Sequence, residues 1–147
     1  MAVQPHDVAG RAARPVHFVP GNRDFYRGPI AEVREKVRSL CPVTPNPLWL
    51  PGAGVVPPAG EACWVGHDGR GDGRRGDFHS SDVMPNDFGL IEEFGGFEES
   101  ADEGRAGPHA LGGEAAEHFR AARPDASQRF RHVTVATHVP PFREARA

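Results

Sequence analysis

Short apolar runs alternate along the chain with stretches of helical periodicity. The run at 16–19 is short and apolar enough to form a buried strand of a parallel sheet. Gly28 and Pro29 then favour the start of a helix, because a proline at this point loses no hydrogen bond. The apolar residues of this helix are Ile30, Val33, Val37 and Leu40. We expect it to end at Cys41 and Pro42.

Residues 42–58 are rich in proline and contain two candidates for short edge strands, at 48–50 and 55–56. The segment 61–66 predicts a further strand. A glycine-rich loop follows this strand and continues to about residue 78. Strand candidates therefore lie on both sides of the first predicted helix.

The second half of the chain predicts one more helix and one more strand. Residues 82–94 favour a weak helix or an extended arm, since Pro85 interrupts them. Residues 95–107 are acidic, and we expect this segment to be flexible. We expect a second amphipathic helix that ends at Pro124. Its apolar residues are Leu111, Ala115, Phe119 and Ala122. Residues 130–137 predict the last strand. This alternation indicates an α/β fold with functional groups at the carboxyl ends of the strands.

The composition limits the classes of protein to consider. With 147 residues the chain can form at most one domain, and its 18 glycines and 15 prolines are many for a compact enzyme. The net charge of −3 and the scattered basic residues argue against nucleic acid or a membrane as partner. Cys41 and Cys63 form no paired framework, and the sequence has no apolar signal core. We therefore expect a cytoplasmic protein.

Polar groups directly follow two of the predicted strands. After the first strand, Gly21 permits a sharp turn that presents an amide, a cation and a carboxylate in succession. These are Asn22, Arg23 and Asp24. The last strand ends in the imidazole of His138. Such groups at strand ends can bind a cation or a phosphate. Taken alone, Asn22 is also a common turn residue and His138 an ordinary histidine at a strand end.

These segments resemble a known family. The Gly-Asn-Arg-Asp sequence at 21–24 resembles the Gly-Asn-His-Asp/Glu block of calcineurin-like metallophosphoesterases. Residues 137–142 resemble the later block that carries a metal-binding histidine. Between them, 66–74 and 86–88 resemble a bacterial branch of the family, in the same order. The resemblance extends from about residue 16 to residue 146.

The resemblance implies a four-layer α/β/β/α sandwich, of which this chain would hold the middle. It implies hydrolysis of phosphate mono- or diesters by two divalent metal ions of the Mn, Fe or Zn type, which share a hydroxide and neutralise the phosphate. Asn22 would supply a neutral oxygen ligand and His138 an imidazole nitrogen. In the glycine-rich loop, which is otherwise typical of a flexible polar segment, Asp68 and Arg74 would contact the substrate or stabilise the loop.

Several positions depart from the family pattern. Arg23 stands where the family has a histidine that contacts the leaving group or the scissile phosphate, and a guanidinium binds phosphate but cannot donate that proton. Asp24, which steadies that histidine in the family, would instead form an ion pair or cap the next segment. Arg70 stands where we expect Trp. The family's Asp-x-His and Gly-Asp blocks before Gly21, and its Gly-His-x-His block after His138, are absent from the sequence.

We therefore expect one partial metallophosphoesterase domain over 1–147, with 1–14 as a loose leader. Metal-dependent hydrolysis of a small phosphoester or a phosphoprotein would be weak or lost, because the two metal ions would be incompletely bound. One alternative is a non-catalytic, anion-binding or regulatory protein that uses Arg23 and the glycine-rich loop. Another is a fragment of an interrupted gene. Unpaired strand edges would favour self-association.

Overall fold

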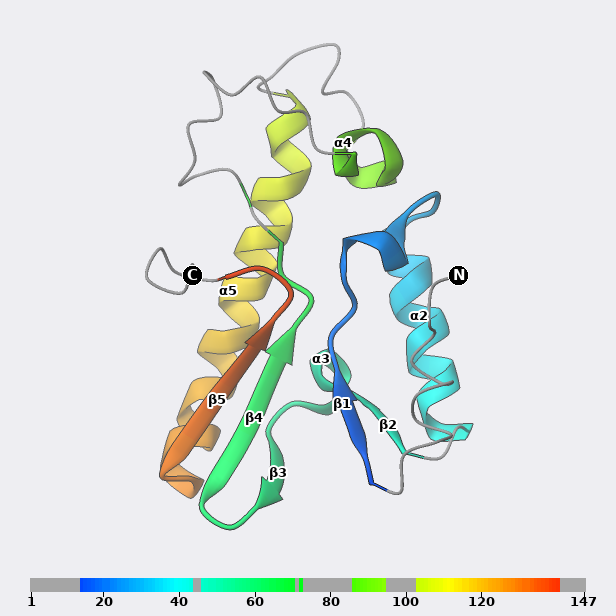
Figure 1. Cartoon of the computed structure of the whole chain (residues 1–147). Coiled ribbons are helices and arrows are strands. Elements are labelled where there is room, and N and C mark those ends of the chain that lie inside the picture. The colour runs from blue at the N-terminus through cyan, green and yellow to red at the C-terminus, as the bar shows by residue number, and fades with distance from the viewer. Residues whose placement is uncertain (1–13, 44–45, 71, 73–85, 95–102, 141–147) are drawn as a thin grey trace.

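The computed structural model describes residues 14–43, 46–70, 72, 86–94 and 103–140 (Figure 1). The strands are β1 (Val16–Phe18), β2 (Pro47–Trp49), β3 (Val56–Ala59), β4 (Ala62–His67) and β5 (His132–Thr137). The α-helices are α2 (Ile30–Leu40), α3 (Leu50–Ala53), α4 (Asp87–Leu90) and α5 (Glu103–Arg129), and the 3-10 helices are η1 (Asn22–Phe25), η2 (Cys41–Val43) and η3 (Glu92–Phe94). The expected leader, except for Arg14, lies outside the described residues, as does Arg74.

The strands form two small sheets, so the predicted α/β class is confirmed in the form of a mixed α/β fold. β1 and β2 pair in parallel, with Val16 opposite Pro47. In the second sheet β4 pairs in parallel with β5 over its whole length and antiparallel with β3. Figure 1 shows β1, β4 and β5 pointing in the same direction. The segments that follow these three strands therefore lie at one end of the molecule.

Helix α2 confirms the prediction from the apolar periodicity. Pro29 precedes it, and the N–H of Ile30 donates to Oε1 of Glu93 at 2.6 Å. This hydrogen bond satisfies one of the donors that the start of a helix leaves open. Ile30 is buried, whereas Leu40, at the other end of the apolar stripe, is 56% exposed. The helix is therefore anchored mainly at its first turn.

Helix α5 is longer than the sequence predicts. It begins at Glu103, inside the segment expected to be flexible up to residue 107, and it continues past Pro124 to Arg129. A proline inside a helix removes a backbone hydrogen bond and costs about 3 kcal/mol. The helix continues because Ala126, only 1% exposed, packs against the side chains of β4. Tertiary packing thus outweighs the local stop signal.

The remaining boundaries are close to the predicted ones. The strand candidates at 48–50 and 55–56 correspond to β2 and β3, with Leu50 already in α3. β4 confirms the strand at 61–66, and β5 begins two residues after the predicted start at 130. The described residues of the segment 82–94 form the two short helices α4 and η3.

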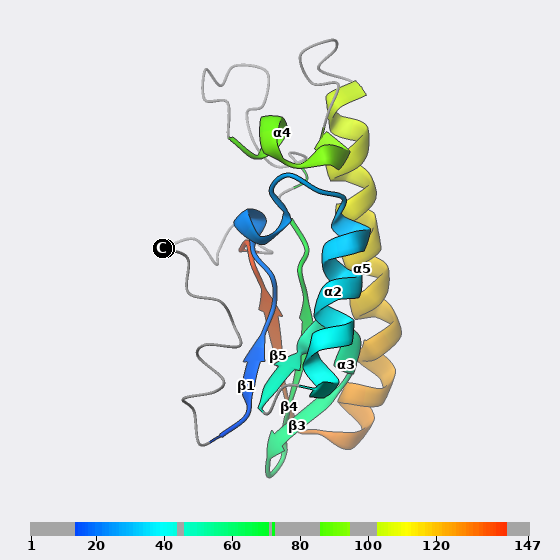
Figure 2. The same cartoon turned by 90° about the vertical axis from the view of Figure 1, so that its right-hand side faces the viewer.

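Two apolar clusters form the core. The first consists of Phe25, Ile30, Ile91 and Phe94. The second consists of Cys63, Val65 and Ala126, with Phe119 and Phe130 packed against it. Figure 2 shows α2 and α5 on the same side of the strands. Within the described residues, no helix is both long and apolar enough to cross a membrane.

Candidate functional site

The segments after β1 and β5 meet at the carboxyl ends of the strands. A Cβ built on Gly21 would lie 2.8 Å from Cε1 and 3.0 Å from Nδ1 of His138, so the imidazole rests on the glycine backbone. The hydroxyl of Thr137 donates to the carbonyl oxygen of Val139 at 2.7 Å and fixes the turn that carries His138. The structure therefore brings together the two strand ends that the sequence singles out.

The turn after β1 places Arg23 and Asp24 at the surface. The carboxylate of Asp24 accepts a hydrogen bond from the N–H of Gly21 at 2.7 Å, and the N–H of Asp24 donates to the carbonyl oxygen of Gly21 at 3.1 Å. Asp24 therefore caps its own turn, which is close to one of its two expected roles. Arg23 is exposed, so its guanidinium is accessible to an anion in solution.

Asn22 is hydrogen-bonded at both ends of its carboxamide. Its Oδ1 accepts from Nη1 of Arg70, and its Nδ2 donates to Oδ2 of Asp87. The other oxygen of Asp87 accepts from the hydroxyl of Tyr26 at 2.7 Å, and this hydrogen bond raises the pKa of Tyr26. We call these four residues, Asn22, Tyr26, Arg70 and Asp87, the Asn22 cluster. It joins η1, the segment after β4 and the start of α4.

Arg70 is buried beside two aromatic rings. Its guanidinium carbon lies 4.3 Å from the ring centroid of Phe25 and 5.8 Å from that of Phe94. A planar guanidinium can stack on aromatic faces, so it fills a space where the resemblance leads us to expect Trp. Burial lowers the pKa of Arg70, while Asp68 and Asp87 oppose this effect. Its Nη2 atom is buried and makes no hydrogen bond within the described part of the chain.

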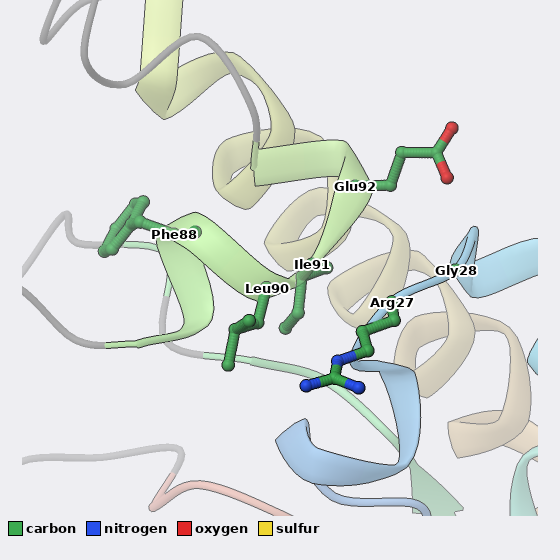
Figure 3. Close-up of a pocket in the computed structure, with 7 residues that line it drawn as sticks. Arg27, Gly28, Phe88, Leu90, Ile91 and Glu92 are labelled. Atoms are coloured by element: carbon green, nitrogen blue, oxygen red, sulfur yellow. The ribbon is translucent and has the colours of Figure 1, made fainter.

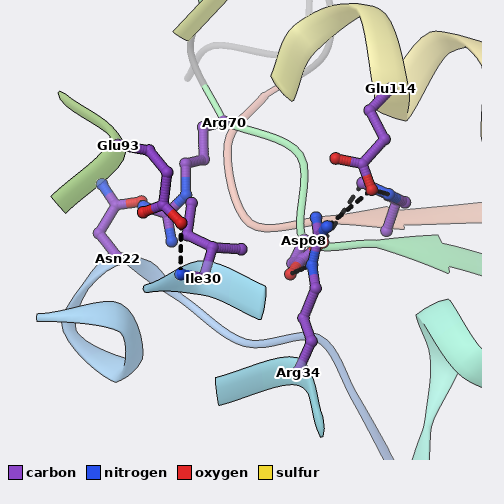
Figure 4. Close-up of polar contacts among 8 residues, drawn as sticks. Asn22, Ile30, Arg34, Asp68, Arg70, Glu93 and Glu114 are labelled. Atoms are coloured by element: carbon purple, nitrogen blue, oxygen red, sulfur yellow. Dashed lines mark hydrogen bonds and ion pairs between the residues drawn. The ribbon is translucent and has the colours of Figure 1, made fainter. Parts of the chain in front are cut away.

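A second arginine joins three elements. Arg34 of α2 donates from Nε and Nη2 to the two oxygens of Asp68, at 2.9 and 2.8 Å, and from Nη1 to Oε1 of Glu114 on α5 at 2.6 Å (Figure 4). We call these residues the Arg34 cluster. Burial by itself lowers the pKa of Arg34, but the bonds to Asp68 and the charges of both carboxylates raise it overall. The side chain of Asp68 is only 1% exposed.

Two histidines pack next to the Arg34 cluster. The rings of His67 and His118 have centroids 4.9 Å apart, and Phe119 lies against both. Nδ1 of His67 lies 3.4 Å from Oδ1 of Asp68 but makes no hydrogen bond to any residue that the structure describes. Burial lowers the pKa of His67 below its ordinary value, although Asp68 acts in the opposite direction. His67 is therefore kept mainly neutral inside the fold.

A small pocket lies beside the Asn22 cluster. Its volume is about 250 Å³, and the residues that line it are Arg27, Gly28, Phe88, Gly89, Leu90, Ile91 and Glu92. Figure 3 shows the Arg27 guanidinium near Leu90 and Ile91, with Glu92 turned away. The backbone N–H of Arg27 donates to the carbonyl oxygen of Leu90 at 2.7 Å. The pocket is smaller than the roughly 300–1,000 Å³ of common ligand sites, and neither Asn22 nor Arg23 lines it.

The structure places the residues selected from the sequence in different settings. Asn22 lies in a hydrogen-bonded cluster, His138 lies on Gly21, and Asp68 is buried in an ion pair. Their proposed roles toward metal or substrate stay predictions. Sequence reasoning missed Arg34, although its position four residues after Ile30 puts it beside the apolar stripe of α2. A basic residue in that position is a signal for a buried ion pair.

Comparison with known proteins adds no assignment. A scan against models of known protein families, a comparison with curated proteins and a comparison with solved structures each find no match. Within the described residues, no group of three or more His, Cys, Asp or Glu side chains is arranged to hold a metal ion. The interpretation of the site therefore rests on the contacts around Asn22, Arg23 and His138.

Proposed function

We propose that this chain binds phosphate mono- or diesters at a site of the calcineurin-like phosphoesterase type and does not hydrolyse them by itself. The site would belong to a four-layer α/β/β/α sandwich. The observation that carries this proposal is the state of Asn22, whose oxygen accepts from Arg70 and whose nitrogen donates to Asp87. A carboxamide engaged in this way beside the exposed Arg23 favours anion binding over metal-dependent catalysis.

The arrangement of the family-like segments supports a phosphoesterase-type origin of the site. Gly21 lies against His138, and Asn22 lies against Asp87, although these pairs are far apart in the sequence. Each of the four residues belongs to a segment that resembles the family. Their meeting at one end of the strands is the arrangement that the resemblance leads us to expect.

Arg23 is the residue proposed to contact the phosphate. Its guanidinium is exposed, permanently charged and able to bind two phosphate oxygens at once. It cannot serve as a general acid, because it does not release a proton at any ordinary pH. The ligand would be a small phosphoester or a phosphoprotein segment, since both present anionic phosphate oxygens that a guanidinium can bind.

A second candidate is metal-dependent hydrolysis of the same esters, and the contact of His138 with Gly21 favours it. Two metal ions would need more ligands than Asn22 and His138, because affinity depends on several converging groups. In this case Mn²⁺ would be required for turnover. The two candidates therefore differ in a measurable way.

Two measurements test the proposal. Calorimetric titration with phenyl phosphate measures binding, and the release of p-nitrophenol from bis(p-nitrophenyl) phosphate, with and without Mn²⁺, measures turnover. We expect binding without turnover, and about five- to tenfold weaker binding for Arg23→Gln, because one charged hydrogen-bonding group is lost. Arg38→Gln, on the exposed surface of α2, is the matched control and keeps the affinity. We also expect Arg23→His to remain without turnover. Turnover that depends on Mn²⁺ would establish the second candidate, and an absence of binding would refute the first.

A further inference from the structure

The charges around Arg70 are mainly negative. Asp68, Asp87 and Glu93 all favour the charged form of its guanidinium. Asp68 already has an ion-pair partner in Arg34. Asp87 accepts hydrogen bonds from Asn22 and Tyr26, and Glu93 accepts one from the N–H of Ile30, but these donors are neutral and leave both negative charges without a direct counter-charge. Since an arginine stays protonated under ordinary conditions, it supplies this region with a fixed positive charge. A bound divalent ion would supply charge in the same way.

The carboxamide of Asn22 does not fit a divalent ion in this arrangement. Its Oδ1 is the atom that could act as a ligand, and it already accepts from Nη1 of Arg70 (Figure 4). A divalent ion at that oxygen would lie next to a guanidinium, and the two like charges would repel each other in a buried setting. The other end of the carboxamide, Nδ2, points to Asp87 and is a donor.

We propose that Arg70 is an internal cation that takes the place of a metal ion beside Asn22 and makes the Asn22 cluster independent of metal. Its guanidinium both holds the carboxamide oxygen and offsets the charges of Asp87 and Glu93. The aromatic rings of Phe25 and Phe94 fix its position. The inference concerns which cation the cluster holds, and it stands whether or not a phosphoester binds at Arg23.

Replacing Arg70 by residues of different charge tests this role. Arg70→Met fills the space beside the aromatic rings but removes the charge, so we expect its melting temperature near pH 7 to fall by about 10 °C. Arg70→Lys keeps the charge and should retain more than half of the lost stability.

The control is Arg38→Met, since Arg38 also lies over an aromatic ring, 5.5 Å from the centroid of Trp49, but on the exposed surface. We expect this change to shift the melting temperature by less than about 2 °C. If Arg70 only filled space, the Met variant would be as stable as the Lys variant at position 70. That result would overturn the proposal. If Arg70→Met does not fold, the double variant Arg70→Met/Asp87→Asn removes one of the negative charges as well. We expect this double variant to fold. If it does not fold, the missing charge is not what prevents folding, and the proposal is refuted.

A measurement on the unmodified chain provides a second test that needs no variant. Mn²⁺ at about 1 mM would stabilise any site with a dissociation constant well below that concentration. We expect the melting temperature to be the same in Mn²⁺ as in a chelator at equal ionic strength. We also expect no selective paramagnetic broadening of the amide signals of Asn22 and Asp87. A rise of several degrees together with broadening at these two residues would show that a metal ion binds there and would refute the proposal. Loss of phosphate binding at Arg23 would leave both results unchanged.

Discussion

Two arginines with opposite surroundings define the region at the carboxyl ends of the strands. Arg34 meets a carboxylate through two parallel hydrogen bonds, and its pKa is raised overall. Arg70 meets a neutral carboxamide and two aromatic rings, and burial lowers its pKa. Arg34 therefore forms a direct ion pair. Arg70 is surrounded by carboxylates, but within the described residues it donates no hydrogen bond to any of them.

The two arginines also differ in how many of their guanidinium nitrogens form hydrogen bonds. The Arg34 cluster ties α2, the segment after β4 and α5 together, and the donors that it uses are directed at protein oxygens. Nη2 of Arg70 and Oε2 of the nearby Glu93 are instead buried without a hydrogen bond in the described part of the chain. Beside the Arg34 cluster the same holds for Nδ1 of His67 and Nε2 of His118, but not for a nitrogen of Arg34. Buried polar atoms of that kind are costly and mark places where function competes with stability.

The largest expected effect is at Asp68. Asp68→Asn leaves the partly buried Arg34 without its main counter-charge, so we expect a loss of about 3 kcal/mol and a fall in melting temperature of about 6–12 °C. Thermal unfolding followed by circular dichroism measures this. If Asp68 served mainly to contact substrate, Asp68→Asn would lose phosphate binding at unchanged stability, and the contrast between the two clusters would be wrong.

A smaller effect is expected from the buried histidine beside the Arg34 cluster. The pKa of His67 in the folded state is lower than the unfolded value of about 6.5. The unfolded chain therefore binds a proton more readily, and folding stability falls as pH decreases from about 6.5 toward the lowered pKa. The loss is limited to about 1.4 kcal/mol for each unit between the two pKa values.

Denaturant unfolding between pH 7.5 and pH 5.5 measures this dependence, and His67→Gln should flatten it. The charged and titratable groups that act on His67 are Asp68, His118, Arg34 and Glu114. His118→Gln is the matched control, because it removes the neighbouring ring and leaves His67 buried. A slope unchanged by His67→Gln would assign the dependence to another group.

The contact between Gly21 and His138 predicts that Gly21→Ala destabilises the wild-type protein but stabilises a protein that lacks the imidazole of His138. In the wild-type background, Gly21→Ala forces the imidazole to move, and we expect a loss of about 1 kcal/mol. In a His138→Ala background the same change should stabilise by about 0.4–1 kcal/mol, because the backbone of Gly21, with φ −102°, suits alanine and the unfolded chain loses freedom. A double-mutant cycle in urea measures the coupling. Zero coupling would mean that the two strand ends do not meet in solution.

The smallest effect is expected at Glu114, the exposed partner of Arg34. Its side chain is 47% exposed, so Glu114→Gln should cost less than about 1 kcal/mol, and added salt should reduce this cost further. Unfolding at low and high ionic strength measures it. A loss as large as that of Asp68→Asn would place the main counter-charge of Arg34 on α5 instead of after β4.

The sequence predicted the elements with strong local patterns. The apolar spacing after Pro29 defined α2, the short apolar run at 16–19 defined β1, and the β-branched run within 130–137 defined β5. The strand predicted at 61–66 corresponds to β4. The end of α5 could not be predicted in this way. Pro124 is a local stop signal, and the packing of Ala126 that overrides it depends on a strand far away in the sequence.

The candidate site was predictable only as a meeting of strand ends. We expected Gly21 and His138 to meet at one edge of a single sheet, but β1 and β5 belong to different sheets. The two residues still meet, because both strands point in the same direction (Figure 1). The partners of Asn22 could not be foreseen, because Arg70 and Asp87 reach it from segments distant in sequence. The one signal in the sequence was Arg70 at the position where the family resemblance leads us to expect Trp. This signal indicated that the surroundings of residue 70 differ from those in the family, but it did not identify Asn22 as the hydrogen-bond partner.

Strand β5 has practical consequences for work with the protein. Val133 and Val135 are 43% and 45% exposed, and within the described residues β4 is the strand that pairs with β5. An edge of this kind can recruit the same edge of another molecule. We therefore expect the protein to stay soluble at low concentration and to aggregate when it is concentrated or frozen. The substitution Val135→Lys should reduce this aggregation.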